Sequence, residues 1–202
     1  MAQQTLTDLR ERLKAWSNRS DISDTKYNDF INIALSRLLR LVRIPVLEAQ
    51  ATLTLVSGEA EIPRDYLEAI DLRVQASGRL RSLERKDVSF VQERKHESGN
   101  PCWFARRGTK FIVAPTPEEG TSLELYYYIT FQPLVQDSDT NWFVSDAPEV
   151  LLYGALSELA LYNRDEVQAA QWEAKFQNHA KEIQQMSDTA EWSGSSLTIQ
   201  LR

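Results

Sequence analysis

The spacing of apolar residues changes twice along the chain, from a helical period to alternation and then back to a helical period. Residues 5–16 carry leucines three and four positions apart, which predicts a short amphipathic helix capped by Thr5 or Thr7. A longer helix is predicted over residues 24–42, with Ser23 as its N-cap. The apolar stripe of this helix is so wide that the helix must be buried on more than one side, in a bundle or at a subunit contact.

The middle of the chain alternates apolar and polar residues, as half-buried strands do. We expect about five or six short strands of an antiparallel sheet, within residues 51–56, 69–75, 79–82, 102–106, 110–114 and 122–131. The last run is the clearest, because every second residue from Leu123 to Ile129 is apolar. Residues 107–109 predict a hairpin turn, and residues 87–95 predict one or two helical turns.

The helical period returns near residue 145. Asp146 and Glu149 have the spacing of a capping box, and Pro148 suits the first turn of a helix. The helix predicted to follow, ending near Tyr162, is again very apolar. A last helix is predicted from about Asp165 to Met186.

The end of the chain has a different pattern from the helices before it. Residues 193–196 are small and form a flexible link. The apolar residues that follow alternate with polar ones, which is strand patterning. Such a tail either adds to its own sheet or donates a strand to a neighbour. The residues that we expect to anchor it are Trp192, Leu197, Ile199 and Leu201.

Together these elements predict an α+β fold. The N-terminal and C-terminal helices form a helical bundle, an antiparallel β-hairpin or sheet region is inserted between them, and an extended C-terminal tail follows. The expected divisions are residues 1–46 and 136–188 for the bundle, 47–135 for the β-rich insertion and 189–202 for the tail.

Composition narrows the classes of function. The 202 residues include 23 Lys and Arg against 29 Asp and Glu, a formal net charge of −6, whereas proteins that wrap DNA usually carry a basic patch. The single cysteine, Cys102, excludes an intrachain disulfide and favours a reducing compartment. We find no apolar run of signal-peptide or membrane-span type, so we expect a soluble protein without a membrane partner.

The sequence predicts no catalytic, cofactor or metal site. His96, His179 and Cys102 do not have the spacing of zinc ligands. Neither a phosphate-binding glycine motif nor a nucleophile elbow is present. We therefore interpret Cys102 as a small packed residue and His179 as a core or interface residue.

Two basic clusters in the sheet region leave nucleic-acid binding open as an alternative. They consist of Arg73, Arg79, Arg81, Arg85 and Lys86, and of Arg94, Lys95, Arg106, Arg107 and Lys110. Trp103 and Phe104 lie beside the second cluster, but interspersed acidic residues dilute the charge of both. The same surface can instead dock on an acidic protein neighbour.

Several segments, taken in order, resemble the tailed-phage head-to-tail adaptor (connector) family. They are IPRDYLEA at 62–69, FIVAPTP at 111–117, LELYYY at 123–128, NWF at 141–143 and PEVLLYGAL at 148–156. They are similar to the family patterns P-x-D-Y-L-E, I-x-x-x-P-x-P, L-x-L-x-Y-Y, N-x-x and P-x-x-L-L-Y-G-A-L. Trp172 fits the last helix, and the resemblance spans most of residues 24–186.

The resemblance implies a structural virion protein of the head–tail junction, assembled in the host cytoplasm. Such proteins dock as a homo-oligomeric ring, commonly a dodecamer, beneath the portal protein, join it to a tail or nozzle protein, and continue the DNA channel. The C-terminal segment would reach the portal or a neighbouring subunit. Genomic DNA would pass without specific binding, which suits an acidic protein because like charge repels phosphate. The alternatives are a generic protein-interaction or assembly module and, less favoured, a nucleic-acid-binding module that uses the basic hairpins.

Overall fold

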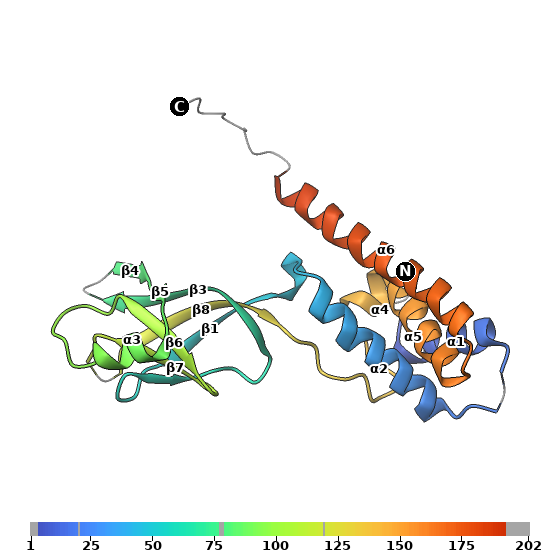
Figure 1. Cartoon of the computed structure of the whole chain (residues 1–202), viewed down its shortest axis with the longest axis horizontal. Coiled ribbons are helices and arrows are strands. Elements are labelled where there is room, and N and C mark those ends of the chain that lie inside the picture. Colours follow the sequence, from blue (N-terminus) through green and yellow to red (C-terminus); the bar gives the residue numbers. More distant parts are fainter. Residues whose placement is uncertain (1–3, 20, 77–78, 119, 193–202) are drawn as a thin grey trace. The chain divides into compact units, whose positions relative to one another are not determined.

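The computed structural model describes residues 4–19, 21–76, 79–118 and 120–192 of the chain. These residues form two compact units, and the fold is α+β, as predicted. The helical unit combines the chain up to Val46 with the chain from Phe131 onward (Figure 1). The sheet unit consists of Leu47–Thr130.

Five helices make up the described part of the helical unit. They are α1 (Leu6–Ser17), α2 (Asp24–Leu41), α4 (Trp142–Asp146), α5 (Pro148–Tyr162) and α6 (Glu166–Trp192). The central helix is α5, since α1, α2, α4 and α6 all pack against it (Figure 1). Its buried residues lie on every face, which is the position that its continuous apolar sequence requires.

Three helices of this unit approach one another closely at Gly154. A Cβ atom at this position would lie 2.8 Å from the Cβ of Ala34 on α2 and 3.0 Å from the ring of Phe176 on α6. Real Cβ atoms do not pack at such distances, so α2, α5 and α6 can meet here only because residue 154 has no side chain. Phe176 is fully buried at this point, which anchors α6 on the bundle.

The segment that returns from the sheet unit is fixed to the bundle by polar side chains. Asn32 on α2 donates a hydrogen bond to the Leu134 carbonyl at 2.9 Å and accepts one from the Leu134 amide at 2.8 Å. The buried Arg10 on α1 donates to Asp137 at 2.8 Å, and this bond is the main reason that the pKa of Arg10 is raised. Residues 131–135, which the sequence pattern grouped with the sheet region, therefore lie with the helices.

Both predicted N-caps of the first two helices are confirmed. Thr5 caps α1 in a capping box, in which its amide donates to Asp8 at 2.8 Å. Ser23 caps α2 and accepts a hydrogen bond from the Lys26 amide at 3.4 Å.

The capping box predicted between Asp146 and Glu149 is wrong. Asp146 is the last residue of α4, a short helix that the sequence pattern does not reveal because one turn has no visible period. Asn141 caps α4 by accepting a hydrogen bond from the Val144 amide at 3.0 Å. The N-cap of α5 is Ala147, which makes no side-chain hydrogen bond.

The last helix is longer than predicted. It continues past Met186 to Trp192, since residues 187–191 contain neither Gly nor Pro and polar side chains bond along the helix. Gln184 donates to Asp188 at 2.7 Å, for example. The first residues of the expected extended tail are thus helical.

The described residues of the sheet unit form two four-stranded sheets and one short helix. Its elements are β1 (Glu48–Thr54), β2 (Glu59–Glu61), β3 (Tyr66–Ala76), β4 (Arg79–Ser82), β5 (Glu84–Arg85), α3 (Val88–Glu93), β6 (Trp103–Arg107), β7 (Lys110–Ala114) and β8 (Ser122–Ile129). Sheet A has the order β1-β8-β3-β4, and sheet B has the order β2-β7-β6-β5. The pairing is antiparallel as predicted, except that β5 and β6 run parallel, with α3 in the connection between them.

Both sheets contribute side chains to one apolar core. Its buried residues are Leu53, Leu55, Ala60, Leu72, Val74, Leu83, Phe104, Phe111, Val113, Leu123, Leu125 and Tyr127. The alternation predicted for β8 is confirmed, because Leu123, Leu125 and Tyr127 are buried while the residues between them are not. The opposite face of sheet B is covered by α3, where Val91 packs with Ala105 and Ile112. The core of this unit is therefore closed by its own elements.

Candidate assembly interface

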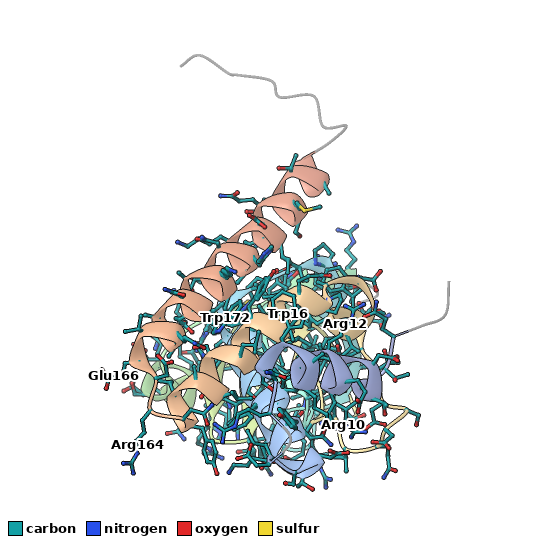
Figure 2. All side chains as sticks on the ribbon, turned by 90° about the vertical axis from the view of Figure 1, so that its right-hand side faces the viewer. Arg10, Arg12, Trp16, Arg164, Glu166 and Trp172 are labelled. Atoms are coloured by element: carbon teal, nitrogen blue, oxygen red, sulfur yellow. The ribbon has the colours of Figure 1, made fainter. Side chains whose placement is uncertain are left out.

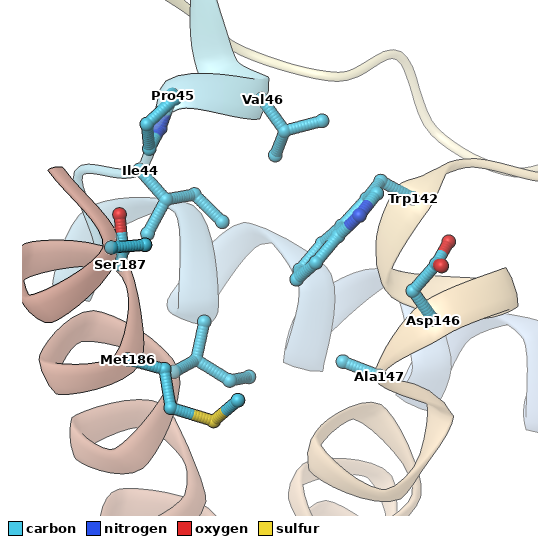
Figure 3. A pocket seen from close by; sticks show the side chains of 10 residues that line it. Ile44, Pro45, Val46, Trp142, Asp146, Ala147, Met186 and Ser187 are labelled. Carbon is cyan, nitrogen blue, oxygen red and sulfur yellow. The ribbon is translucent and has the colours of Figure 1, made fainter. Parts of the chain in front are cut away.

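An open apolar groove lies within the helical unit, between the end of α2, the junction of α4 and α5, and the C-terminal part of α6 (Figure 3). Its cavity volume is about 560 Å³, and its lining consists of Ile44, Pro45, Val46, Trp142, Asp146, Ala147, Ile183, Met186, Ser187 and Ala190. Asp146 is the one charged residue of this lining. The Met186 side chain is 73% exposed and Val46 is 39% exposed, so apolar surface faces solvent here.

The walls of the groove are held by backbone and side-chain contacts. Gln184 on α6 accepts a hydrogen bond from the Arg43 amide at 2.7 Å and donates one to the Arg43 carbonyl at 2.8 Å. The segment after α2 is therefore fixed against α6, and Pro45 prevents it from continuing as α-helix. On the opposite wall, Trp142 packs against Phe143 with ring centroids 5.2 Å apart. Figure 3 shows Trp142 and Val46 pointing into the space between α6 and α4.

The groove exists because α6 extends beyond its partner helix. α6 has 27 residues and α5 has 15. At 1.5 Å per residue, this makes α6 about 18 Å longer than α5. The first part of α6 buries Ala169, Phe176 and Ala180, whereas Met186 further along the helix is exposed. The C-terminal part of α6 is thus left with an apolar face that α5 cannot reach.

A second candidate surface is an aromatic cluster on α1, α5 and α6. The rings of Tyr153 and Trp172 stack with centroids 5.8 Å apart, and His179 stacks on Tyr153 at 5.1 Å. Trp16 contacts Trp172 at 5.8 Å and is 52% exposed (Figure 2). The Lys175 ammonium lies 4.4 Å from the centroid of Trp172. Partly exposed aromatic side chains that pack against one another in this way are typical of protein interfaces.

An ion-pair network fixes α6 and α5 to α2. The Arg37 guanidinium contacts Glu158 and Glu173 at 2.6 Å each and lies over the Phe176 ring at 4.9 Å. Burial raises the pKa of Glu173, but the hydrogen bonds from Arg37 and Gln177 outweigh burial and hold this pKa below its ordinary value of 4.5. For Arg37, burial lowers the pKa, but the bonds to Glu173 and Glu158 outweigh burial, so the pKa of Arg37 is raised overall. These contacts favour the charged forms of Arg37 and Glu173 and fix α6 to α2.

The family model described as SU10 adaptor protein matches residues 4–200 of the chain. The chain belongs to the SU10 adaptor protein family. It is therefore a phage structural adaptor protein and a virion component, as the resemblance in its sequence implied, and the family is structural rather than enzymatic. A search of curated proteins found no match. In the described part of this SU10 adaptor, no helix is long and apolar enough to cross a membrane.

The predicted anchors of this SU10 adaptor stand at and beyond the end of α6. Trp192 is the last residue of the helix, and its side chain is not described. Leu197, Ile199 and Leu201 lie outside the described residues. Their anchoring role therefore remains a prediction.

The basic clusters of the SU10 adaptor are partly neutralised. Glu59 contacts Arg107 at 2.5 Å, and it lies 3.8 Å from Lys95 and from Lys110. Arg73 of the other cluster pairs with Asp71 at 2.6 Å. Part of each cluster is therefore already paired within the chain, which reduces the positive charge available to phosphate groups.

The prediction that Cys102 is a packed residue is wrong. Cys102 is exposed because it lies in the loop before β6, where its thiol donates to the Asn100 carbonyl at 3.2 Å. His179 belongs to the aromatic cluster, with its side chain 39% exposed and its Nδ1 3.0 Å from Glu182. Among the residues with described positions, no three His, Cys, Asp or Glu side chains gather to hold a metal ion.

The groove has one signal in the sequence that could have predicted it. Ile183 and Met186 continue the apolar stripe of the last helix for more turns than a 15-residue partner helix can cover. An apolar stripe that is longer than the helix packed against it predicts an exposed apolar face. Ile44 and Trp142 lie in irregular or one-turn segments, so their part in the groove has no periodic signal.

Proposed function

We propose that this chain is a ring-forming head-to-tail adaptor, which docks on the portal of a tailed phage, links it to a tail or nozzle protein and continues the DNA channel. The family match over residues 4–200 carries this proposal. A homo-oligomeric ring, with the dodecamer as the expected state, is the assembly proposed. Such an assembly requires each subunit to bury apolar surface against its neighbours.

The distribution of exposed apolar side chains supports an interface on the helical unit. Among the described residues, the large hydrophobic side chains that are exposed in this unit are Trp16, Ile33, Leu41, Val46, Val135, Leu161, Tyr162, Val167 and Met186. Those of the sheet unit are Val56, Ile70 and Leu80. We infer that the helical unit makes the contacts within the ring and with the portal, and that the sheet unit faces outward or toward the tail.

The first test is the solution mass of the purified chain, alone and mixed with a candidate portal protein. A ring of the free chain, or a monomer that enters a ring only on the portal, is the expected result. A chain that stays monomeric with every portal tried would contradict the proposal and favour a generic assembly module.

A second test concerns the tail. Removal of residues 193–202 should leave the fold intact, since α6 and the core formed by the described residues precede them. It should weaken binding to the portal or to neighbouring subunits. Circular dichroism checks that the fold is intact, and the same mass measurement checks the weakened binding. If the truncated chain unfolds, the tail instead completes its own fold.

DNA is proposed to pass through the ring without specific binding, in keeping with the formal net charge of −6. Glu-to-Lys changes on the face that lines the channel should slow DNA ejection, and unchanged ejection would contradict this part. Binding of the isolated chain to duplex DNA, weakening steeply with salt, would instead favour the nucleic-acid-binding alternative. The internal pairing of Glu59 with three basic residues argues against that alternative.

A further inference from the structure

The groove on the helical unit lies where the described chain ends. Ala190, the last residue of its lining, precedes the end of α6 at Trp192 by two residues. Ten further residues, 193–202, follow α6 and lie outside the structure. We propose that this segment folds back along α6 and places Leu197, Ile199 and Leu201 in the groove of its own chain.

The lengths of the segment and of the groove agree. The groove extends along α6 from Ala190 to Ile183, seven residues or about 10 Å of helix. In extended conformation, the stretch from Leu197 to Leu201 spans about 13 Å. The link of residues 193–196 can bridge at most about 14 Å, and it contains Gly194 and three serines, which suit a reversal of direction. The link is therefore long enough for the return and too short to carry the segment far from α6.

The chemistry of the two surfaces also agrees. The groove is lined mainly by apolar side chains, and its volume of about 560 Å³ falls in the ordinary range of ligand-binding clefts. In residues 197–202, apolar and polar side chains alternate, so three apolar side chains can face the groove while Thr198 and Gln200 face water. The groove is open to solvent, so water can reach the backbone of a segment that lies in it.

Charge adds a further match. Asp146 is the one charged side chain of the groove lining, and Arg202 is the one charged side chain of residues 193–202. An extended segment that enters the groove beside α6 can bring Arg202 near Asp146 on the opposite wall. Because the segment is tethered beside the groove, its effective concentration there is in the range of about 1 mM, which a separate partner must exceed.

This arrangement has a consequence for assembly, and that consequence rests on the proposed function. In the free subunit the groove and the tail would cover each other, so neither exposes a large apolar surface before a portal or neighbouring subunit is present. Docking would then release both at once.

One side chain of the groove provides a direct readout. Apart from Met1, Met186 is the only methionine, so a sample labelled with 13C in the methionine methyl groups gives at most two signals. Removal of residues 197–202 should shift the Met186 methyl signal of the free chain, because the apolar side chains that cover it are lost. The triple variant Leu197→Ser, Ile199→Ser and Leu201→Ser should give the same shift. The matched variant with Thr198→Ala and Gln200→Ala should leave the signal in place.

A spin label tests proximity and identifies the chain that supplies the tail. A nitroxide at Gln200→Cys, in a Cys102→Ser background, should abolish the Met186 methyl signal within the same molecule. Val46→Asp, which places a charge in the groove at a partly exposed site, should restore the signal without loss of helical circular dichroism. A mixture of labelled chains without nitroxide and unlabelled chains with nitroxide should keep the signal.

The outcomes separate this proposal from the proposed function. If the Met186 methyl signal is unchanged both by truncation and by the nitroxide, the tail does not occupy the groove, and this holds whether or not the chain binds a portal. If broadening occurs in the mixed sample, the tail of a second copy fills the groove and the assignment to the same chain is overturned. Failure to bind any portal, with the intramolecular broadening intact, would contradict the proposed function alone.

Discussion

The helical unit and the sheet unit treat their apolar surface in opposite ways. In the sheet unit, two sheets share one core, and α3 covers the second face of sheet B. In the helical unit, α5 is covered on all sides, but α6 extends about 18 Å further than α5 and keeps an apolar face next to an open groove. The described elements of the sheet unit complete its core, whereas those of the helical unit leave part of its apolar surface uncovered.

The two units also differ in where their ion pairs lie. In the sheet unit, ion pairs such as Glu59 with Arg107 lie at the surface. In the helical unit, the Arg37 network lies between helices, and the carboxyl groups with lowered pKa values also belong to this unit. They are Asp8, Asp21, Asp24, Asp139 and Glu173. Two of these carboxyl groups join different helices, since Asp24 on α2 pairs with Lys14 on α1 and Glu173 on α6 pairs with Arg37 on α2. The others are held by hydrogen bonds within a cap or a loop.

The largest expected effect tests whether the sheet core stands alone. Phe111→Ala should lower the free energy of unfolding of the sheet unit by about 3–5 kcal/mol, because Phe111 is 1% exposed in a core shared by both sheets. Hydrogen exchange, read separately for peptides of each unit, should show loss of protection in residues 47–130. Equal loss in both units would mean that the two cores unfold as one, and the contrast drawn above would fail.

The next effect tests the close packing of helices at Gly154. Gly154→Val should destabilise the helical unit by about 1–3 kcal/mol, since its side chain would overlap Ala34 and Phe176. Urea unfolding followed by circular dichroism measures the change. The smaller Gly154→Ala should be partly rescued by Ala34→Gly, which removes the atom 2.8 Å away. Absence of any rescue would show that the helices do not meet at this point.

Much of this contrast could be predicted from the sequence. The burial of α5 follows from its continuous apolar residues, and the buried alternation of β8 follows from its period of two. Both signals depend only on residues near in sequence. They predict which face is buried, but not which element covers it.

The features that sequence analysis missed depend on the lengths or pairing of distant elements. The parallel pairing of β5 with β6 involves a two-residue strand, which has no period of its own. The groove requires α6 to be longer than α5. It also requires Gln184 to bind the Arg43 backbone, which is a contact between residues 141 positions apart. The family resemblance predicted an adaptor from motif order, yet it did not reveal this groove.

A smaller effect separates the two units by pH. Burial raises the pKa of Glu173, but the hydrogen bonds from Arg37 and Gln177 lower this pKa by more. The pKa of Glu173 in the folded state is therefore below its value in the unfolded state. The stability from this group is present above the ordinary value of 4.5 and is lost as the pH falls through the folded pKa. Hydrogen exchange at decreasing pH should therefore show the helical unit opening before the sheet unit. Glu173→Gln should reduce this pH dependence, and simultaneous opening of both units would contradict the comparison.

The smallest expected effect concerns the surface charge of the sheet unit. Glu59→Gln should change the free energy of unfolding by less than about 1 kcal/mol, because the side chains of its partners Arg107 and Lys110 reach solvent and water screens the pairs. The same change leaves three basic side chains without their shared carboxylate, so it should raise the affinity of the chain for duplex DNA at low salt. Fluorescence anisotropy of a labelled duplex measures this, with Glu61→Gln as the matched control, since Glu61 pairs with Lys110 alone among the described residues. If both variants bind DNA equally, the neutralising role of Glu59 is wrong, and the sheet unit keeps its charge balance by other means.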